Sequence, residues 1–135
     1  MSDICNKKIV IDLDDTISKT IDGKYAESIP CKQVVDRLRE YKDKGFEIVI
    51  YSSRNMRTYD RNIGLINVHT LPVILNFLDK YHIPYDEVIV GKPWAGKEGF
   101  YVDDKAVRPS EFISMEEEEI HGMLKREADT IRSLC

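Results

Sequence analysis

Four short apolar runs, each followed at once by polar residues, constrain the fold of this chain more than any other feature. They cover residues 9–11, 46–51, 88–91 and 99–102. Short runs rich in β-branched and aromatic residues are typical of buried strands. Longer segments in which apolar residues recur with helical spacing follow the first, second and fourth runs. This alternation of strand and helix predicts an α/β fold with a central parallel sheet.

Helix boundaries are also marked in the sequence. The first helix is expected to stop near Gly45, and the second to begin at Thr70 and end before Pro84. The third is expected to begin at Ser114, with Glu117 three residues later as a capping box. Each helix has an apolar stripe, and the stripe of the third is predicted to pack on the sheet. The stripes are Val34, Val35, Leu38 and Tyr41; Leu71, Ile74, Leu75, Leu78 and Tyr81; and Ile120, Met123, Leu124, Ile131 and Leu134.

Two insertions interrupt this pattern. Residues 17–26 carry Asp22-Gly23 between short β-prone stretches, which predicts a hairpin beside the end of the first strand. Residues 54–69 hold three arginines against one acidic residue. Neither insertion is long enough to form a separate domain, so we expect one domain over residues 1–135.

Length, charge and cysteine content exclude several classes of protein. The 135 residues carry a formal net charge of −4, which gives no overall attraction to nucleic acid or anionic membrane. No apolar run approaches the roughly 20 residues that a membrane span needs. Residues 1–8 lack the apolar core of a signal peptide. Cys5, Cys31 and Cys135 fit neither a disulfide framework nor a zinc spacing, which favours a reducing cytoplasm.

The first apolar run ends in a cluster of carboxylates. Residues alternate across a strand, so Asp12 and Asp14 leave it on the same face. Two carboxylates forced together favour a bound cation, and Mg²⁺ prefers such oxygen ligands. A solvated turn or a helix cap is the simpler alternative. A calcium loop starting at Asp12 is excluded, because Ile17 and Gly23 stand where it needs Gly and Glu.

The other three runs also end in groups suited to phosphate or metal. Ser52-Ser53-Arg54 follows the second run, Lys92 the third, and Asp103-Asp104 the fourth. Open parallel sheets bind ligands at the carboxyl ends of their strands. Residues 91–98 almost spell a phosphate-binding P-loop. However, Glu98 stands where that loop needs a hydroxyl, and a strand rather than a helix is predicted next.

Together these segments resemble the haloacid dehalogenase (HAD) superfamily of phosphotransferases. The matching pattern is Asp-x-Asp-x-Thr from Asp12, then Ser52, then Lys92, then an acidic pair. More narrowly, residues 51–58 and 91–104 are similar to small HAD phosphatases associated with capsular polysaccharide biosynthesis. The resemblance implies a single Rossmann-like, three-layer domain that is capless and has only a short flap beside an open active site.

The resemblance also implies catalytic and metal-binding roles. Asp12 would be the nucleophile that forms an aspartyl-phosphate, and Asp14 the general acid and then base. Mg²⁺ would be bound by the Asp12 carboxylate, the Asp14 backbone carbonyl and the pair Asp103 and Asp104, of which either could be the direct ligand. Thr16 would help to fix the nucleophile loop.

Phosphate and leaving-group contacts complete the expected site. Ser52, or its neighbour Ser53, would donate a hydrogen bond to the phosphate. Lys92 would supply positive charge, with Lys97 as a weaker alternative. Arg54 and Arg57 are candidates for binding an anionic or sugar-bearing leaving group, with a solvated loop face as the alternative. Trp94 could stack on a sugar or base, or pack against the Lys92 loop.

We therefore expect a Mg²⁺-dependent phosphatase acting on a small phosphomonoester, such as a sugar phosphate or a capsule precursor. A polynucleotide-end or nucleotide phosphatase of the same superfamily is the first alternative. A non-catalytic module that binds a phosphorylated ligand is the second. A nucleic-acid partner is not expected, whereas a homo-oligomer could cover the open site.

Overall fold

The computed structural model describes residues 6–135, so Cys5 and most of the N-terminal stretch tested for a signal peptide lie outside the described residues. The chain divides into two compact units, Met1–Trp94 and Ala95–Cys135. Each unit is described separately below. The expectation that they form one domain stays a prediction. Over residues 6–135, no helix is both long and apolar enough to cross a membrane.

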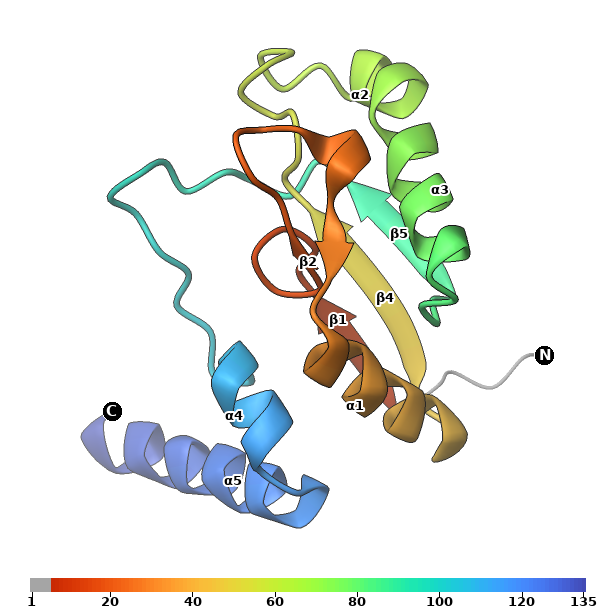
Figure 1. The fold of residues 1–135 in the computed structure, drawn as a ribbon. Helices are drawn as coiled ribbons and strands as arrows, with labels where there is room; N and C mark the ends of the chain where they lie inside the picture. Colours follow the sequence, from red (N-terminus) through yellow and green to blue (C-terminus); the bar gives the residue numbers. More distant parts are fainter. Residues whose placement is uncertain (1–5) are drawn as a thin grey trace, which may run out of the picture. The chain divides into compact units, whose positions relative to one another are not determined.

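A three-stranded parallel sheet forms the centre of the N-terminal unit (Figure 1). Its strands are β1 (Lys8–Ile11), β4 (Glu47–Ser52) and β5 (Glu87–Val90), in the order β1-β4-β5. Ile11 is in register with Ile50, and Ser52 with Val90. All three strands therefore end at one edge, and the predicted strands at residues 9–11, 46–51 and 88–91 are confirmed.

Three helices of the N-terminal unit connect these strands. They are α1 (Lys32–Asp43), α2 (Ile63–His69) and α3 (Leu71–Lys80). The stripe predicted for the first helix is fully buried on α1: Val34, Val35, Leu38 and Tyr41. Both connections cross the sheet in the same direction, and right-handed crossovers place their helices on one face. This unit alone therefore has two layers of a mixed α/β fold compatible with a Rossmann-like arrangement, and the third layer stays a prediction.

The predicted flap is a hairpin of β2 (Ser18–Lys19) and β3 (Ile29–Pro30), joined through the short 3-10 helix η1 (Tyr25–Glu27). Asp22 and Gly23 form its turn with φ values of 56° and 67°. The second strand of this hairpin, β3, begins beyond the predicted residues 17–26, because η1 occupies part of the connection between the two strands. Helix α2 was not predicted at all, and it lies within the insertion expected at residues 54–69.

The strand predicted at residues 99–102 is wrong. This segment has no regular secondary structure, and Phe100, Tyr101 and Val102 are 81%, 56% and 89% exposed. The turn before it is tight, since a Cβ on Gly99 would collide with the backbone carbonyl oxygen of Ala95. Apolar, β-prone residues alone do not make a strand, because backbone hydrogen bonds to a neighbouring strand are also required.

The C-terminal unit contains α4 (Pro109–Ser114) and α5 (Glu117–Leu134). Ser114 was expected to begin a helix, but it is the last residue of α4. The capping box lies two residues later, where the Glu116 backbone N–H donates to the Glu119 carboxylate at 3.1 Å. Along α5 only Ile120 of the predicted stripe is buried, and Leu134 is 75% exposed. The packing of this stripe on the sheet stays a prediction.

Candidate active site

A tight loop after β1 presents the two leading aspartates. The Leu13 carbonyl oxygen accepts hydrogen bonds from the backbone N–H groups of Ile17 and Ser18, at 2.8 and 3.0 Å. Asp15 has a φ of 63°, a left-handed conformation that Asp tolerates better than most residues. The buried side chains of Leu13 and Ile17 anchor the loop in the core. The position of Asp12 is thus fixed by the backbone around it.

Asp12 lies between a hydroxyl and an ammonium group. Thr16 Oγ1 donates to Asp12 Oδ2 at 3.1 Å, and Lys92 Nζ donates to Asp12 Oδ1 at 3.3 Å. The backbone of Lys92 is held next to β4, because the Lys92 N–H donates to the Ser52 carbonyl oxygen. The Asp12 side chain is 34% exposed, so it remains accessible from solvent. The structure therefore gathers Asp12, Thr16 and Lys92 at the ends of β1 and β5.

The Asp14 carboxylate contacts Arg54, a residue that the sequence analysis placed at the leaving group or on a solvated loop face. Arg54 Nε donates to Asp14 Oδ2 at 3.0 Å, and Arg54 Nη2 donates to Asp14 Oδ1 at 2.7 Å. The Arg54 side chain is 1% exposed, so it does not lie on a solvated loop face. Ser18 Oγ adds a weaker bond to Asp14 Oδ1 at 3.3 Å. Both carboxylate oxygens of Asp14 are therefore engaged, which leaves its backbone carbonyl as the better candidate metal ligand.

Tyr25 of η1 covers the Arg54–Asp14 pair and was missed by sequence reasoning. The Arg54 guanidinium carbon lies 4.3 Å from the centre of the Tyr25 ring, a favourable cation–π contact. Burial, and secondarily the nearby Asp14 carboxylate, raise the pKa of the Tyr25 phenol. Arg54 Nη1 is buried and has no hydrogen-bond partner among residues 6–135. The two N–H groups of Arg54 Nη1 are thus left for waters or ligand oxygens.

The two candidate serines at the end of β4 differ in environment. Ser52 is 1% exposed, and its Oγ accepts the backbone N–H of Arg54 at 3.0 Å. This bond uses an Oγ lone pair and leaves the hydroxyl proton for another acceptor. Ser53 is half-buried and closes the following turn, since its carbonyl oxygen accepts the Met56 N–H. Either hydroxyl has the chemistry to donate to a phosphate, and the choice between them stays a prediction.

Asp103 and Asp104 belong to the C-terminal unit, and both are exposed. The Asp103 carboxylate accepts the Lys105 backbone N–H at 2.8 Å within a local turn. Over residues 6–135, no three His, Cys, Asp or Glu side chains lie close enough together to hold a metal ion. The chemistry of the predicted donors still suits Mg²⁺, because all are hard oxygens. Metal binding by Asp12, Asp14, Asp103 and Asp104 therefore stays a prediction.

Comparison with solved structures relates this fold to a known crystal structure. A structural genomics target from Vibrio cholerae is 55% identical over 90% of this chain and 98% of its own, with a TM-score of 0.88. The chain belongs to the same family as this Vibrio cholerae protein. The shared fold of the family is therefore the mixed α/β arrangement described above.

More distant similarity is found to chains of a Pnkp1/Rnl/Hen1 RNA repair complex. Two such chains are 21% and 23% identical to this one, with TM-scores of 0.46 and 0.45. This chain spans only 30% and 34% of their lengths. No protein-family model and no curated protein matches the chain. The family assignment therefore depends on the Vibrio cholerae structure, and membership of the HAD superfamily stays a prediction.

Proposed function

We propose that this protein is a Mg²⁺-dependent phosphomonoester hydrolase of the HAD type. The observation that best supports the proposal is the environment of Asp12. A carboxylate at the end of a parallel strand, accessible to solvent and hydrogen-bonded to Thr16 and Lys92, is suited to attack a phosphate that the lysine also binds. The proposed substrate is a small phosphomonoester, such as a sugar phosphate or a precursor of a capsular polysaccharide.

In the first half-reaction an Asp12 carboxylate oxygen bonds to phosphorus while the bond from phosphorus to the leaving oxygen breaks. The leaving oxygen takes a proton from Asp14. The Lys92 ammonium and a serine hydroxyl at the end of β4 stabilise the charge that builds up on the phosphoryl oxygens. Because Lys92 already contacts Asp12 at 3.3 Å, a phosphate bound to the lysine would lie next to the nucleophile.

In the second half-reaction a water attacks the aspartyl-phosphate, and Asp14 accepts its proton. Inorganic phosphate leaves and the Asp12 carboxylate is regenerated. Two hydrogen bonds from Arg54 suit the ionised carboxylate of Asp14, which is the form needed for this step. The first half-reaction needs the protonated form, so the contact between Arg54 and Asp14 must loosen when substrate binds.

The proposed cofactor is Mg²⁺. The Asp12 carboxylate and the Asp14 backbone carbonyl would hold it, and Asp103 and Asp104 are the further predicted ligands. A bound divalent cation would neutralise part of the phosphate charge. The residues of the N-terminal unit would supply two hard oxygen ligands, which is typical of Mg²⁺ sites that keep several waters.

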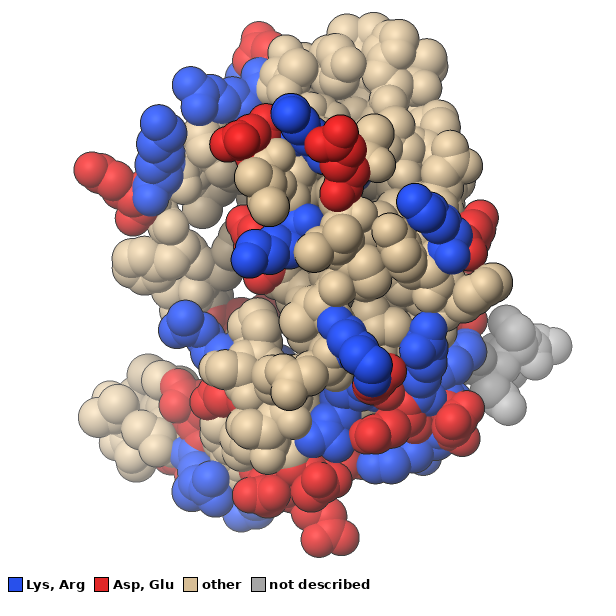
Figure 2. Space-filling model, in the orientation of Figure 1, with Lys and Arg blue, Asp and Glu red and all other residues tan. Residues whose placement is uncertain are grey.

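A phosphatase with the same chemistry that acts on polynucleotide ends instead of small esters remains the alternative, but no observation of the structure favours it. On the face drawn in Figure 2, the Lys and Arg side chains (blue) are interspersed with Asp and Glu side chains (red). The net charge of −4 also gives no general attraction to a polyanion. A non-catalytic phosphate-binding module is the alternative of another class, and it would not need the two leading aspartates.

The decisive experiment is a phosphate-release screen with and without Mg²⁺. The panel should contain sugar phosphates, polyol phosphates, nucleotides and oligonucleotides with terminal phosphates. We expect Mg²⁺-dependent release from one or more small esters, abolished in Asp12→Asn. Folding of that variant is checked by circular dichroism and thermal unfolding. No release from any ester, or release that survives Asp12→Asn, would refute the proposal. Preferential release from oligonucleotides would replace the small-molecule substrate with a polynucleotide end.

A further inference from the structure

A pocket close in the chain to Arg54 and Lys92 contains Arg57 and Trp94, which the sequence suggested for the leaving group, and it takes no part in the two half-reactions proposed above. It has a volume of about 570 Å³, within the range of small-molecule sites, and all its residues belong to the N-terminal unit. It is lined by Met56, Arg57, Asp60, Arg61, Pro93 and Trp94. On one side of the pocket the lining residues come a few positions after Arg54 in the chain, and on the other side they come directly after Lys92. The pocket is therefore placed to receive the part of a substrate that carries the phosphate.

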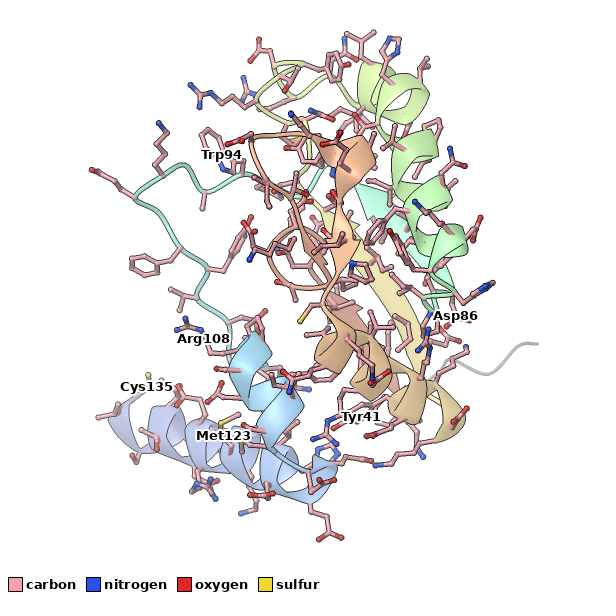
Figure 3. All side chains as sticks on the ribbon, viewed as in Figure 1. Tyr41, Asp86, Trp94, Arg108, Met123 and Cys135 are labelled. Carbon is pink, nitrogen blue, oxygen red and sulfur yellow. The ribbon has the colours of Figure 1, made fainter. Side chains whose placement is uncertain are left out.

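The chemistry of the pocket combines an aromatic face with positive charge. Trp94, on the loop after β5 (Figure 3), is 47% exposed. The Arg57 guanidinium carbon lies 5.5 Å from the centre of its ring. Arg61 contacts Asp60 only at 4.0 Å, and these side chains are 80% and 96% exposed, so that pair is weak. A sugar ring can stack on the indole, while a guanidinium binds a carboxylate or phosphate with two hydrogen bonds.

The loop that carries Arg57 is held in a defined conformation. Asn55, Asp60 and Arg61 have φ values of 61°, 47° and 64°, which non-glycine residues rarely adopt. The Arg61 backbone N–H donates to the Met56 carbonyl oxygen at 2.8 Å, and the buried Thr70 hydroxyl donates to Asn55 Oδ1 at 2.7 Å. Strained backbone of this kind persists where surrounding contacts enforce it, often at ligand sites. The pocket thus has a preformed wall.

We propose that this pocket binds the leaving group of the substrate, and that the leaving group is a sugar ring carrying a second anion, either a carboxylate or another phosphate. The inference rests on the proposed phosphatase activity and makes its substrate specific. Trp94 would contact the ring and Arg57 the second anion, while Lys92 binds the phosphate that is removed. Sugar phosphates without the second anion would then be poorer substrates.

The kinetic test uses substrates matched in pairs. Glucose 1-phosphate is compared with glucuronic acid 1-phosphate, which carries a carboxylate at C6 of the same ring, and fructose 6-phosphate with fructose 1,6-bisphosphate, which adds a phosphate. We expect kcat/KM to be at least about tenfold higher for one or both doubly anionic members, a difference of about 1.4 kcal/mol. Arg57→Met should raise KM for that member about tenfold and affect its partner much less. Arg132→Met, at an exposed arginine of α5, is the control and should change neither.

A binding test separates this inference from the proposed activity. Trp94 is the single tryptophan of the chain, so its fluorescence reports on the pocket. In Asp12→Asn, which cannot turn over, glucuronic acid 1-phosphate or fructose 1,6-bisphosphate should quench it saturably. The additional substitution Arg57→Met should raise the dissociation constant about tenfold. Quenching without phosphate release by the wild type would sustain the pocket and refute the phosphatase. Release with equal kcat/KM within both pairs, or binding unchanged by Arg57→Met, would overturn the pocket assignment.

Discussion

Arg54 donates two hydrogen bonds to the carboxylate of Asp14, although the two residues are 40 positions apart in the chain. The contact joins the end of β4 to the loop that follows β1. Tyr25 stacks on the same guanidinium, so the flap and both strand ends meet at this pair. We propose that Arg54 positions the carboxylate of Asp14, the proposed general acid and base.

Replacing Arg54 should reduce both stability and activity. Arg54→Met leaves a partly buried Asp14 without its main partner, which should cost about 2–3 kcal/mol of unfolding free energy in urea titrations. It should lower kcat about 10–100-fold and change the pH dependence of kcat, because Asp14 loses its orientation. Arg54→Lys should recover part of the stability but less of the activity, since an ammonium cannot form the paired bonds. Wild-type kcat and pH profile in Arg54→Met would refute the positioning role.

Asp14→Asn should separate the two half-reactions. The amide oxygen can accept only one of the two Arg54 hydrogen bonds, and the amide cannot accept a proton from water, so breakdown of the phosphoenzyme should slow by about 100-fold or more. Acid quenching with ³²P-labelled substrate should trap labelled protein. The double variant with Asp12→Asn is the control and should carry no label. If folded Asp14→Asn turns over measurably without accumulating label, Asp14 does not act in the second step.

The acidic pair can be tested by its effect on metal dependence. Asp103→Asn and Asp104→Asn remove charge from exposed side chains, so neither should change the unfolding free energy measurably. The variant that loses a direct ligand should need about tenfold or more Mg²⁺ for half-maximal activity, and the other a smaller increase. Mg²⁺ titrations of phosphate release measure both. Unchanged Mg²⁺ dependence in the two single variants and in the double variant would contradict the metal assignment.

Asp86 should make stability depend on acid pH. It lies just before β5 (Figure 3), and Lys42 Nζ donates to its two oxygens at 2.7 and 2.8 Å, while the Ile48 N–H donates to Oδ2 at 2.8 Å. The Lys42 bonds, with help from Ile48, hold the pKa of Asp86 below its usual value. A lowered folded-state pKa contributes stability that is complete above the unfolded pKa of about 3.9 and is lost as pH falls through the lower folded value.

Asp86→Asn should therefore be less stable than the wild type by about 1 kcal/mol between about pH 5 and 8, a figure reduced for partial exposure. The difference should shrink below about pH 4, when the wild-type carboxylate becomes protonated. Urea unfolding over this pH range measures it. Asp36→Asn, which removes an exposed partner of Lys32 on α1, is the control and should have a smaller effect. A stability difference independent of pH would show that the charge of Asp86 contributes nothing.

Local patterns were sufficient for much of the N-terminal unit. The three strands of the sheet, helices α1 and α3, and the flap turn at Asp22 and Gly23 were predicted because spacing, β-branched residues and turn residues act over short distances. The meeting of Asp12 with Lys92 was also predictable, since parallel strands bring their carboxyl ends to one edge. Helix α2 was missed because it lies in a segment judged by its arginines rather than by its apolar spacing.

Sequence alone determined where the three strands of the sheet lie along the chain, the loop that presents Asp12 and Asp14, and the residue types at the end of each strand. Only the tertiary structure decided that Arg54 is buried against Asp14, that Tyr25 covers it, and that residues 99–102 form no strand. Such contacts depend on which distant groups become neighbours and on whether a backbone segment finds a partner. Neither is encoded in the spacing of residues along the chain.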